Sequence, residues 1–137
     1  MTALLSFVVP DAPVAMARPR VAVRGGKPHG YLPTGAQAAM WRIRQAAVDA
    51  LGDRPRFEGA VQLTAVAFVR MPASIPKRDR PTALPTRRPD TDNYAKTLLD
   101  GLSVLWLDDA QVTDLCVRKR FAVDSSPRWE IRVESLG

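Results

Sequence analysis

The amino-acid sequence predicts an α+β protein, an α/β sandwich in which a mixed β-sheet of about four to five strands packs against two helices. Two segments repeat apolar residues every three or four positions, several others alternate apolar with polar residues, and the two kinds are interleaved along the chain. The chain has 137 residues, of which 46% are hydrophobic. This length suits one domain with a real core, so we predict a single domain over residues 1–137.

The first half of the chain contains three predicted strands and a helix. Residues 4–9 and the shorter segment 21–24 are expected strands, and Gly25-Gly26 predicts a turn or hairpin. Thr34 can cap a helix that repeats small apolar residues and ends near Gly52. Residues 60–69 are apolar on both faces, so we expect this strand in the centre of the sheet.

The second half begins with a proline-rich segment, residues 71–89, in which we expect a mobile basic loop without regular structure. A second helix is predicted over residues 92–100, with Gly101 as its stop. Residues 111–123 read as a long strand with Arg118 and Lys119 exposed, and a last strand alternates from Trp129 onward. The turn residues between these two strands predict a hairpin.

Composition excludes several kinds of chemistry. One cysteine, Cys116, permits no intrachain disulfide and fits the reducing cytoplasm. One histidine, His29, lies in a predicted loop, which argues against a zinc site and a serine–histidine triad. The sequence contains no run of eighteen apolar residues, so we predict no transmembrane helix and expect no membrane partner. The net charge of +6 and pI of about 10.2 indicate a phosphate or nucleic-acid partner, with solubility alone as the alternative.

Residues 87–112 gather five aspartates and one lysine. Clustered carboxylates repel each other, and a bound divalent cation would remove that repulsion. Asp90 and Asp92 lie at a predicted helix start, where they are either caps or ligands, but only one residue can be the N-cap. Asp108 and Asp109 are either turn residues or ligands.

Lys96 lies one helical turn after Asp92, so it forms either a weak surface ion pair or a charge that binds the scissile phosphate. Asp100 extends the same face and can pair with Lys96. Magnesium takes oxygen ligands and keeps several waters, so two or three carboxylates suffice. Such an ion polarises a phosphate and activates a bound water.

The stretch RPDTDNYAKTLLDGL, followed by WLDDAQV, resembles the signature of the RusA family of crossover-junction endodeoxyribonucleases, the Holliday junction resolvases. The early segment VPDAPVAMARPRVAVRGGKPHGYLP and the later VRKRF also resemble family members, so the resemblance covers nearly the whole chain. The acidic part is a compound pattern and therefore specific, whereas the early part is loose.

The resemblance implies a homodimeric, magnesium-dependent enzyme, with Mn²⁺ as an acceptable substitute. It would nick two opposing strands of a four-way DNA junction symmetrically during recombination and repair. The metal-binding positions of the family fall on Asp90, Asp92 and Asp109, and the catalytic lysine falls on Lys96. Asp100 and Asp108 match acidic positions with a supporting role.

The same resemblance implies a bacterial or phage-encoded protein that is cytoplasmic and associated with the nucleoid. We expect contacts to DNA phosphates from basic residues outside the helices. These residues are Arg18, Arg20, Lys77, Arg78, Arg87 and Arg88.

Two other functions stay open. One is a nuclease for flaps or forks, and the other is a non-catalytic junction-binding protein, against which the complete set of four site residues argues. We expect Asp92 and Asp109 to meet within one chain, with residues 102–107 running back extended beside the helix. In the competing arrangement the partner subunit supplies Asp109. Trp41, Trp106 and Trp129 are candidates for the core or for the interface.

Overall fold

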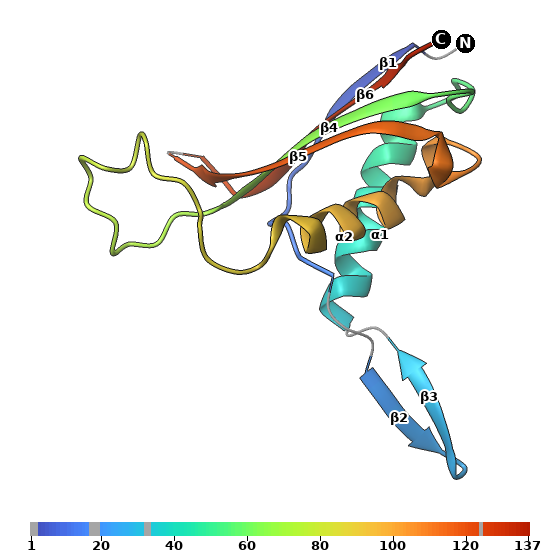
Figure 1. The fold of residues 1–137 in the computed structure, drawn as a ribbon, viewed down its shortest axis with the longest axis horizontal. Helices are drawn as coiled ribbons and strands as arrows, with labels where there is room; N and C mark the ends of the chain where they lie inside the picture. Colours follow the sequence, from blue (N-terminus) through green and yellow to red (C-terminus); the bar gives the residue numbers. More distant parts are fainter. Residues whose placement is uncertain (1–2, 17–19, 32–33, 124) are drawn as a thin grey trace.

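The computed structural model describes residues 3–16, 20–31, 34–123 and 125–137. It contains a four-stranded sheet in the order β1-β6-β4-β5 and a two-stranded sheet of β2 and β3 (Figure 1). The strands are β1 (Leu4–Val9), β2 (Arg20–Arg24), β3 (Lys27–Tyr31), β4 (Val61–Arg70), β5 (Val112–Ala122) and β6 (Arg128–Ser135). The helices are α1 (Thr34–Leu51), α2 (Thr91–Leu102) and two short 3₁₀ turns, η1 (Ser103–Leu105) and η2 (Asp109–Gln111).

The four-stranded sheet is mixed, as predicted. Strand β6 is antiparallel to both β1 and β4, whereas β5 is parallel to β4. Strand β4 has a neighbour on each edge, which confirms its central position. Its alternate residues Val61, Leu63, Ala65 and Ala67 are fully buried, because they face the helices.

Both long helices cover the same face of this sheet (Figure 1). Helix α1 buries the predicted stripe of small residues and Ile43, and α2 buries Leu98 and Leu102. The prediction that Gly101 stops α2 is wrong, since the helix continues to Leu102. A Cβ at Gly101 would lie 2.5 Å from Cγ2 of Ile43, so this glycine permits the close approach of α1 and α2.

The predicted hairpin of the last two strands is also wrong. Strands β5 and β6 lie on opposite edges of β4 and do not pair with each other. The turn residues between them correctly predict a reversal of direction, because β5 is parallel and β6 antiparallel to β4. They do not reveal that β4, which is apolar on both faces, lies between the two strands.

Strands β2 and β3 form the hairpin predicted at Gly25-Gly26, and it extends away from the helices (Figure 1). His29 was expected in a loop but is an exposed residue of β3. Trp106 and Trp129 belong to the core, whereas Trp41 is 58% exposed. Within the described ranges, no helix is long and apolar enough to cross a membrane.

Candidate active site

The two predicted metal ligands at the start of α2 are exposed. Asp90 is the N-cap residue, yet its side chain makes no capping hydrogen bond. Its backbone carbonyl instead accepts from the N–H groups of Asn93 and Tyr94, at 3.1 and 3.4 Å. The first turn of α2 also contains Asp92, which is exposed and has no hydrogen-bond or ion-pair partner among the described residues. Capping therefore does not account for the pair.

Lys96 is likewise without a carboxylate partner. In the described part of the chain the ion pairs are Arg78–Asp79 at 3.9 Å and Arg128–Glu130 at 2.7 Å. The alternative of an ion pair between Lys96 and Asp92 or Asp100 is thus not realised. The ammonium of Lys96 is exposed one helical turn after Asp92, where it can meet an anion from outside the chain.

The second acidic region, residues 106–111, is hydrogen-bonded throughout, and we call it the WLDDAQ loop. The indole Nε1 of buried Trp106 donates to Oδ1 of Asp109 at 2.7 Å. Asp108 is the N-cap of η2, and its Oδ1 accepts from the N–H of Ala110 at 2.9 Å. The two adjacent aspartates therefore differ: Asp108 caps a turn, and Asp109 has one oxygen fixed by an indole.

Gln111 anchors the WLDDAQ loop to the body of the protein. Its Oε1 accepts from the backbone N–H groups of Leu107 and Asp108, both at 3.0 Å. Its Nε2 donates to the carbonyls of Phe57 and Gly59, at 3.1 and 3.0 Å. One side chain thus fixes the loop beside the start of β4.

The expectation that Asp92 and Asp109 meet within one chain is wrong. Residues 103–105 continue past α2 as η1 and do not run back extended, because the backbone N–H of Phe57 donates to the carbonyl of Leu105 and holds that turn. Asp109 therefore lies in η2, between the C-terminal end of α2 and the start of β5 at Val112. Figure 1 shows that β5 starts beside the C-terminal end of α2.

The start of α2 lies instead next to the C-terminal part of β5. There, Nζ of Lys119 donates to the carbonyls of Arg87 and Pro89, at 3.1 and 2.9 Å, just before α2 begins. Lys119 follows Val112 by seven positions in β5, which corresponds to about 23 Å at roughly 3.3 Å per residue. The two acidic regions of one chain thus lie at opposite ends of this span.

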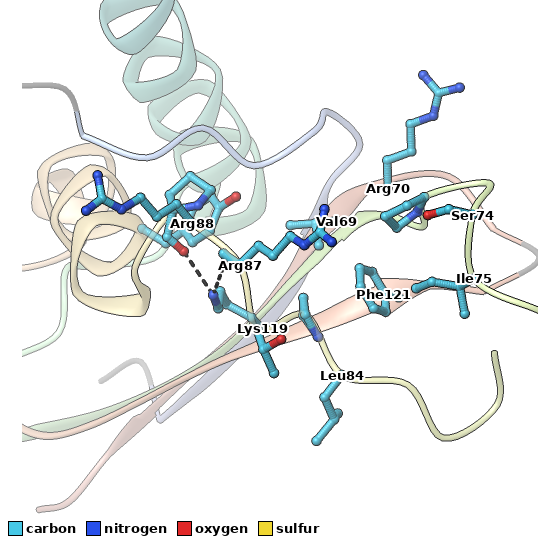
Figure 2. A pocket seen from close by; sticks show the side chains of 14 residues that line it. Val69, Arg70, Ser74, Ile75, Leu84, Arg87, Arg88, Lys119 and Phe121 are labelled. Carbon is cyan, nitrogen blue, oxygen red and sulfur yellow. Dashed lines mark hydrogen bonds between the residues drawn. The ribbon is translucent and has the colours of Figure 1, made fainter. Parts of the chain in front are cut away.

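Sequence reasoning missed the role of Lys119, which was expected to be exposed. Its side chain is half-buried and attaches the end of the basic loop to β5, directly before Asp90 (Figure 2). The alternation of β5 placed Lys119 on a polar face, and only the tertiary pairing of the loop with that face reveals the contact. Lys119 thereby positions the segment that begins the acidic pair.

The basic loop, residues 71–89, contains neither helix nor strand, as predicted. Successive turns fix its backbone, for example through the N–H of Ala83 and the carbonyl of Asp79 at 2.9 Å. All four of its predicted DNA-binding cations are exposed, and they are Lys77, Arg78, Arg87 and Arg88.

Arg18 lies outside the described residues. Arg20 begins β2, and only the backbone of Arg20 is described. Upstream of them, the backbone N–H of Met16 donates to the carbonyl of Asn93 at 2.9 Å. This bond brings the segment before Arg18 to the first turn of α2. The phosphate contacts expected of Arg18 and Arg20 stay predictions.

Tyr94, in the first turn of α2, packs into the hydrophobic core. Its side chain is 4% exposed and its ring meets that of Trp129 edge to face, at a centroid distance of 6.1 Å. Burial raises the pKa of the Tyr94 hydroxyl above its usual value of 10.0, so the phenol is neutral at physiological pH. The first turn of α2, which contains Asp92, is therefore anchored in the core through Tyr94.

Among the described residues, no three acidic, histidine or cysteine side chains of one chain come together in a way that could hold a metal ion. This agrees with the separation of Asp109 from Asp90 and Asp92. The metal-binding and catalytic roles of these residues and of Lys96 stay predictions.

A basic α+β domain with exposed carboxylates beside a cationic loop has the features of an enzyme that acts on nucleic acid. The family model described as "Endodeoxyribonuclease RusA" matches residues 10–134, nearly the whole chain. The chain belongs to the RusA family of endodeoxyribonucleases.

A curated relative is similar over almost its full length. The chain is 32% identical over 142 aligned positions to the "Uncharacterized protein YqaN" of Bacillus subtilis (strain 168), and the alignment covers 96% of each protein. The name of this relative states no activity, so the functional argument rests on membership of the RusA family.

Proposed function

We propose that this protein is a magnesium-dependent endonuclease that resolves four-way DNA junctions by paired nicks. The observation that carries the proposal is the start of α2, where the side chains of Asp90, Asp92 and Lys96 are exposed and have no partner in the described part of the chain. Charged side chains in such an arrangement are free to bind ions and phosphates. The RusA match supplies the class of reaction, hydrolysis of DNA within a strand.

The donor set fits magnesium. Asp90 and Asp92 offer only oxygen atoms, which this ion prefers, and within the described ranges neither side chain makes a capping bond or an ion pair. When bound, Mg²⁺ polarises the phosphodiester and provides an activated water. Lys96 adds a positive charge on the same helical face, where it stabilises the charge that develops on the scissile phosphate.

The separation of the two acidic regions supports a site shared between two subunits. Asp90 and Asp92 of one subunit would hold the ion together with Asp109 of the partner subunit, which is the competing arrangement considered above. A two-fold homodimer then contains two such sites, and a four-way junction has matching two-fold symmetry. Each nick would need both subunits.

A heterodimer of two inactive variants tests the shared site. We expect Asp92→Asn and Asp109→Asn homodimers each to be inactive, and the mixed dimer to nick one strand of a junction. Shared sites place both substitutions in one site and leave the other wholly native. If each site belongs to one chain, both sites of the mixed dimer are broken, and the absence of nicking would reject the shared arrangement.

The preferred substrate is tested with synthetic DNA. A mobile four-way junction, a flap, a fork and a linear duplex are incubated with the protein, with and without Mg²⁺, and nicks are mapped at nucleotide resolution. We expect paired, symmetric nicks in the junction only when the metal is present. Preferential nicking of flaps or forks would favour the other branched-DNA nuclease, and binding without nicking would favour a junction-binding protein.

A further inference from the structure

A cavity of about 380 Å³ lies immediately before Asp90, and we call it the loop pocket (Figure 2). The basic loop, the ends of β4 and β5 and the first turn of α2 enclose it. Arg87, Arg88 and Pro89 line it, and Asp90 is the next residue in the chain. A group bound in this pocket would therefore lie beside the proposed site of hydrolysis.

The lining of the loop pocket combines an apolar interior with cations. The apolar side chains include Phe121 of β5 and Ile75 and Leu84 of the loop. Phe121 is half-buried but does not pack against the hydrophobic core, and Leu84 is 57% exposed. These side chains are therefore not explained by the stability of the core.

The charges around the loop pocket are all positive. Arg70, Arg87, Arg88 and Lys119 line it, and none of the described aspartates and glutamates does. The three guanidinium groups are exposed and have no ion pair with any described carboxylate. Lys119 is different, since its two hydrogen bonds to loop carbonyls hold the rim in place. The pocket is thus pre-formed and suited to an anionic ligand with an apolar part.

A nucleotide has this combination of a flat apolar base and a phosphate. The cavity volume is near the lower end of the range for ligand sites, about 300–1,000 Å³, so it suits one nucleotide and excludes a duplex. Proteins that bind single-stranded DNA stack bases on aromatic rings and contact the backbone with cations. The same two elements are present here in Phe121 and the arginines.

We propose that the loop pocket receives the base of one unpaired nucleotide beside the scissile phosphate, stacked on Phe121, while Arg87 and Arg88 contact its backbone. This inference rests on the proposed function, since it takes branched DNA as the ligand. It assigns a specificity role to the pocket, because the base that enters it would influence where the strand is nicked.

The test measures binding to a four-way junction in EDTA, so that no cleavage occurs. Each nucleotide beside the crossover is replaced in turn by an abasic one. At one position we expect the wild-type protein to lose about 5- to 100-fold in affinity, the usual effect of one stacked base. Phe121→Leu, which keeps apolar bulk but removes the ring, should bind the intact and the abasic junction equally.

The matched control is Phe7→Leu, which changes another half-buried phenylalanine, in β1, outside the loop pocket. It should distinguish intact from abasic DNA as the wild type does. Circular dichroism establishes that both variants fold. Retained discrimination by Phe121→Leu, or none by the wild type, would overturn the proposal. Loss of dimers in Phe121→Leu alone would also overturn it, because a segment of a second copy would then occupy the pocket.

Nicking of the intact junction by the wild type in Mg²⁺ separates this proposal from the proposed function. If the wild type discriminates against the abasic junction but does not nick, the pocket stands and the endonuclease function fails. If it nicks but binds both junctions equally, the function stands and the pocket fails.

Discussion

The two acidic regions of this chain have similar residues but opposite surroundings. At the start of α2, Asp90 and Asp92 are exposed, and their side chains have no partner among the described residues. In the WLDDAQ loop, Asp108 and Asp109 each accept a hydrogen bond from the loop itself. The first region is free to bind an external ion, whereas the second is built to present one carboxylate in a fixed direction.

The largest expected effect distinguishes the two adjacent aspartates of the loop. Asp109→Asn, like Asp92→Asn, should reduce junction nicking by more than about 100-fold, beyond the 10- to 100-fold typical of residues that only support a metal ligand. Asparagine keeps the shape but removes the charge that holds the ion. Binding to the junction in EDTA should survive or tighten, because repulsion toward phosphates falls.

Asp108→Asn is the control. Asparagine is as good an N-cap as aspartate, so η2 should persist and nicking should stay within a few-fold of the wild type. If Asp108→Asn were as inactive as Asp109→Asn, the division of roles within the loop would be wrong.

A smaller effect is expected for Trp106, the residue that orients Asp109. Trp106→Phe removes the indole donor, so the Mg²⁺ concentration for half-maximal nicking should rise by about 10- to 100-fold. At saturating Mg²⁺ the rate should approach that of the wild type. Leu105→Val removes buried bulk from the neighbouring position but no donor, and should leave the Mg²⁺ requirement unchanged. Equal shifts in the two variants would reduce the role of Trp106 to packing.

Gln111 should affect stability more than chemistry. Gln111→Ala removes four hydrogen bonds, and bonds of this kind contribute roughly 0.5–1.5 kcal/mol each. Because Gln111 is only half-buried, water compensates part of the loss, and we expect a fall of about 1–3 kcal/mol in the free energy of unfolding.

Urea denaturation measures this change. Gln45→Ala, on the exposed face of α1, should have no destabilising effect. A Gln111→Ala variant as stable as Gln45→Ala would show that the WLDDAQ loop does not depend on this anchor.

The sequence predicted those features that depend on local pattern. The apolar run of β4, the apolar stripe of α1 and the proline-rich loop all have a physical cause within a few residues, and the structure confirms them. The resemblance to the RusA family came from a local compound motif, and the family match confirms it.

The features that failed depend on contacts between distant segments. Gly101 looked like a helix stop in the local sequence. Its actual role is to let Ile43 approach closely, and Ile43 belongs to the other helix. The path after α2 was predicted from chain length alone, but the hydrogen bond from Phe57 to Leu105 decides it. Lys119 looked like a surface residue because its acceptors precede it by about thirty residues. Local periodicity contains none of this information.

The smallest expected effect concerns the charges around the two acidic regions. The WLDDAQ loop contains no lysine or arginine, whereas Arg87 and Arg88 lie just before Pro89 and Asp90, which lead into α2. If these cations contact DNA phosphates, binding releases counterions, and log K falls with log salt at about −0.9 per phosphate contact. Arg87→Ala should therefore lower junction affinity only a few-fold but make the salt slope shallower by about one contact.

The control is Arg132→Ala, which removes the same charge from an exposed position of β6. Arg132 lies on the sheet with residues of β1 and β4, away from the basic loop, so this variant should keep the wild-type slope. Fluorescence titrations at several salt concentrations measure both slopes. Equal slopes for Arg87→Ala and Arg132→Ala would mean that net charge, and not the position of the loop beside Asp90, governs binding.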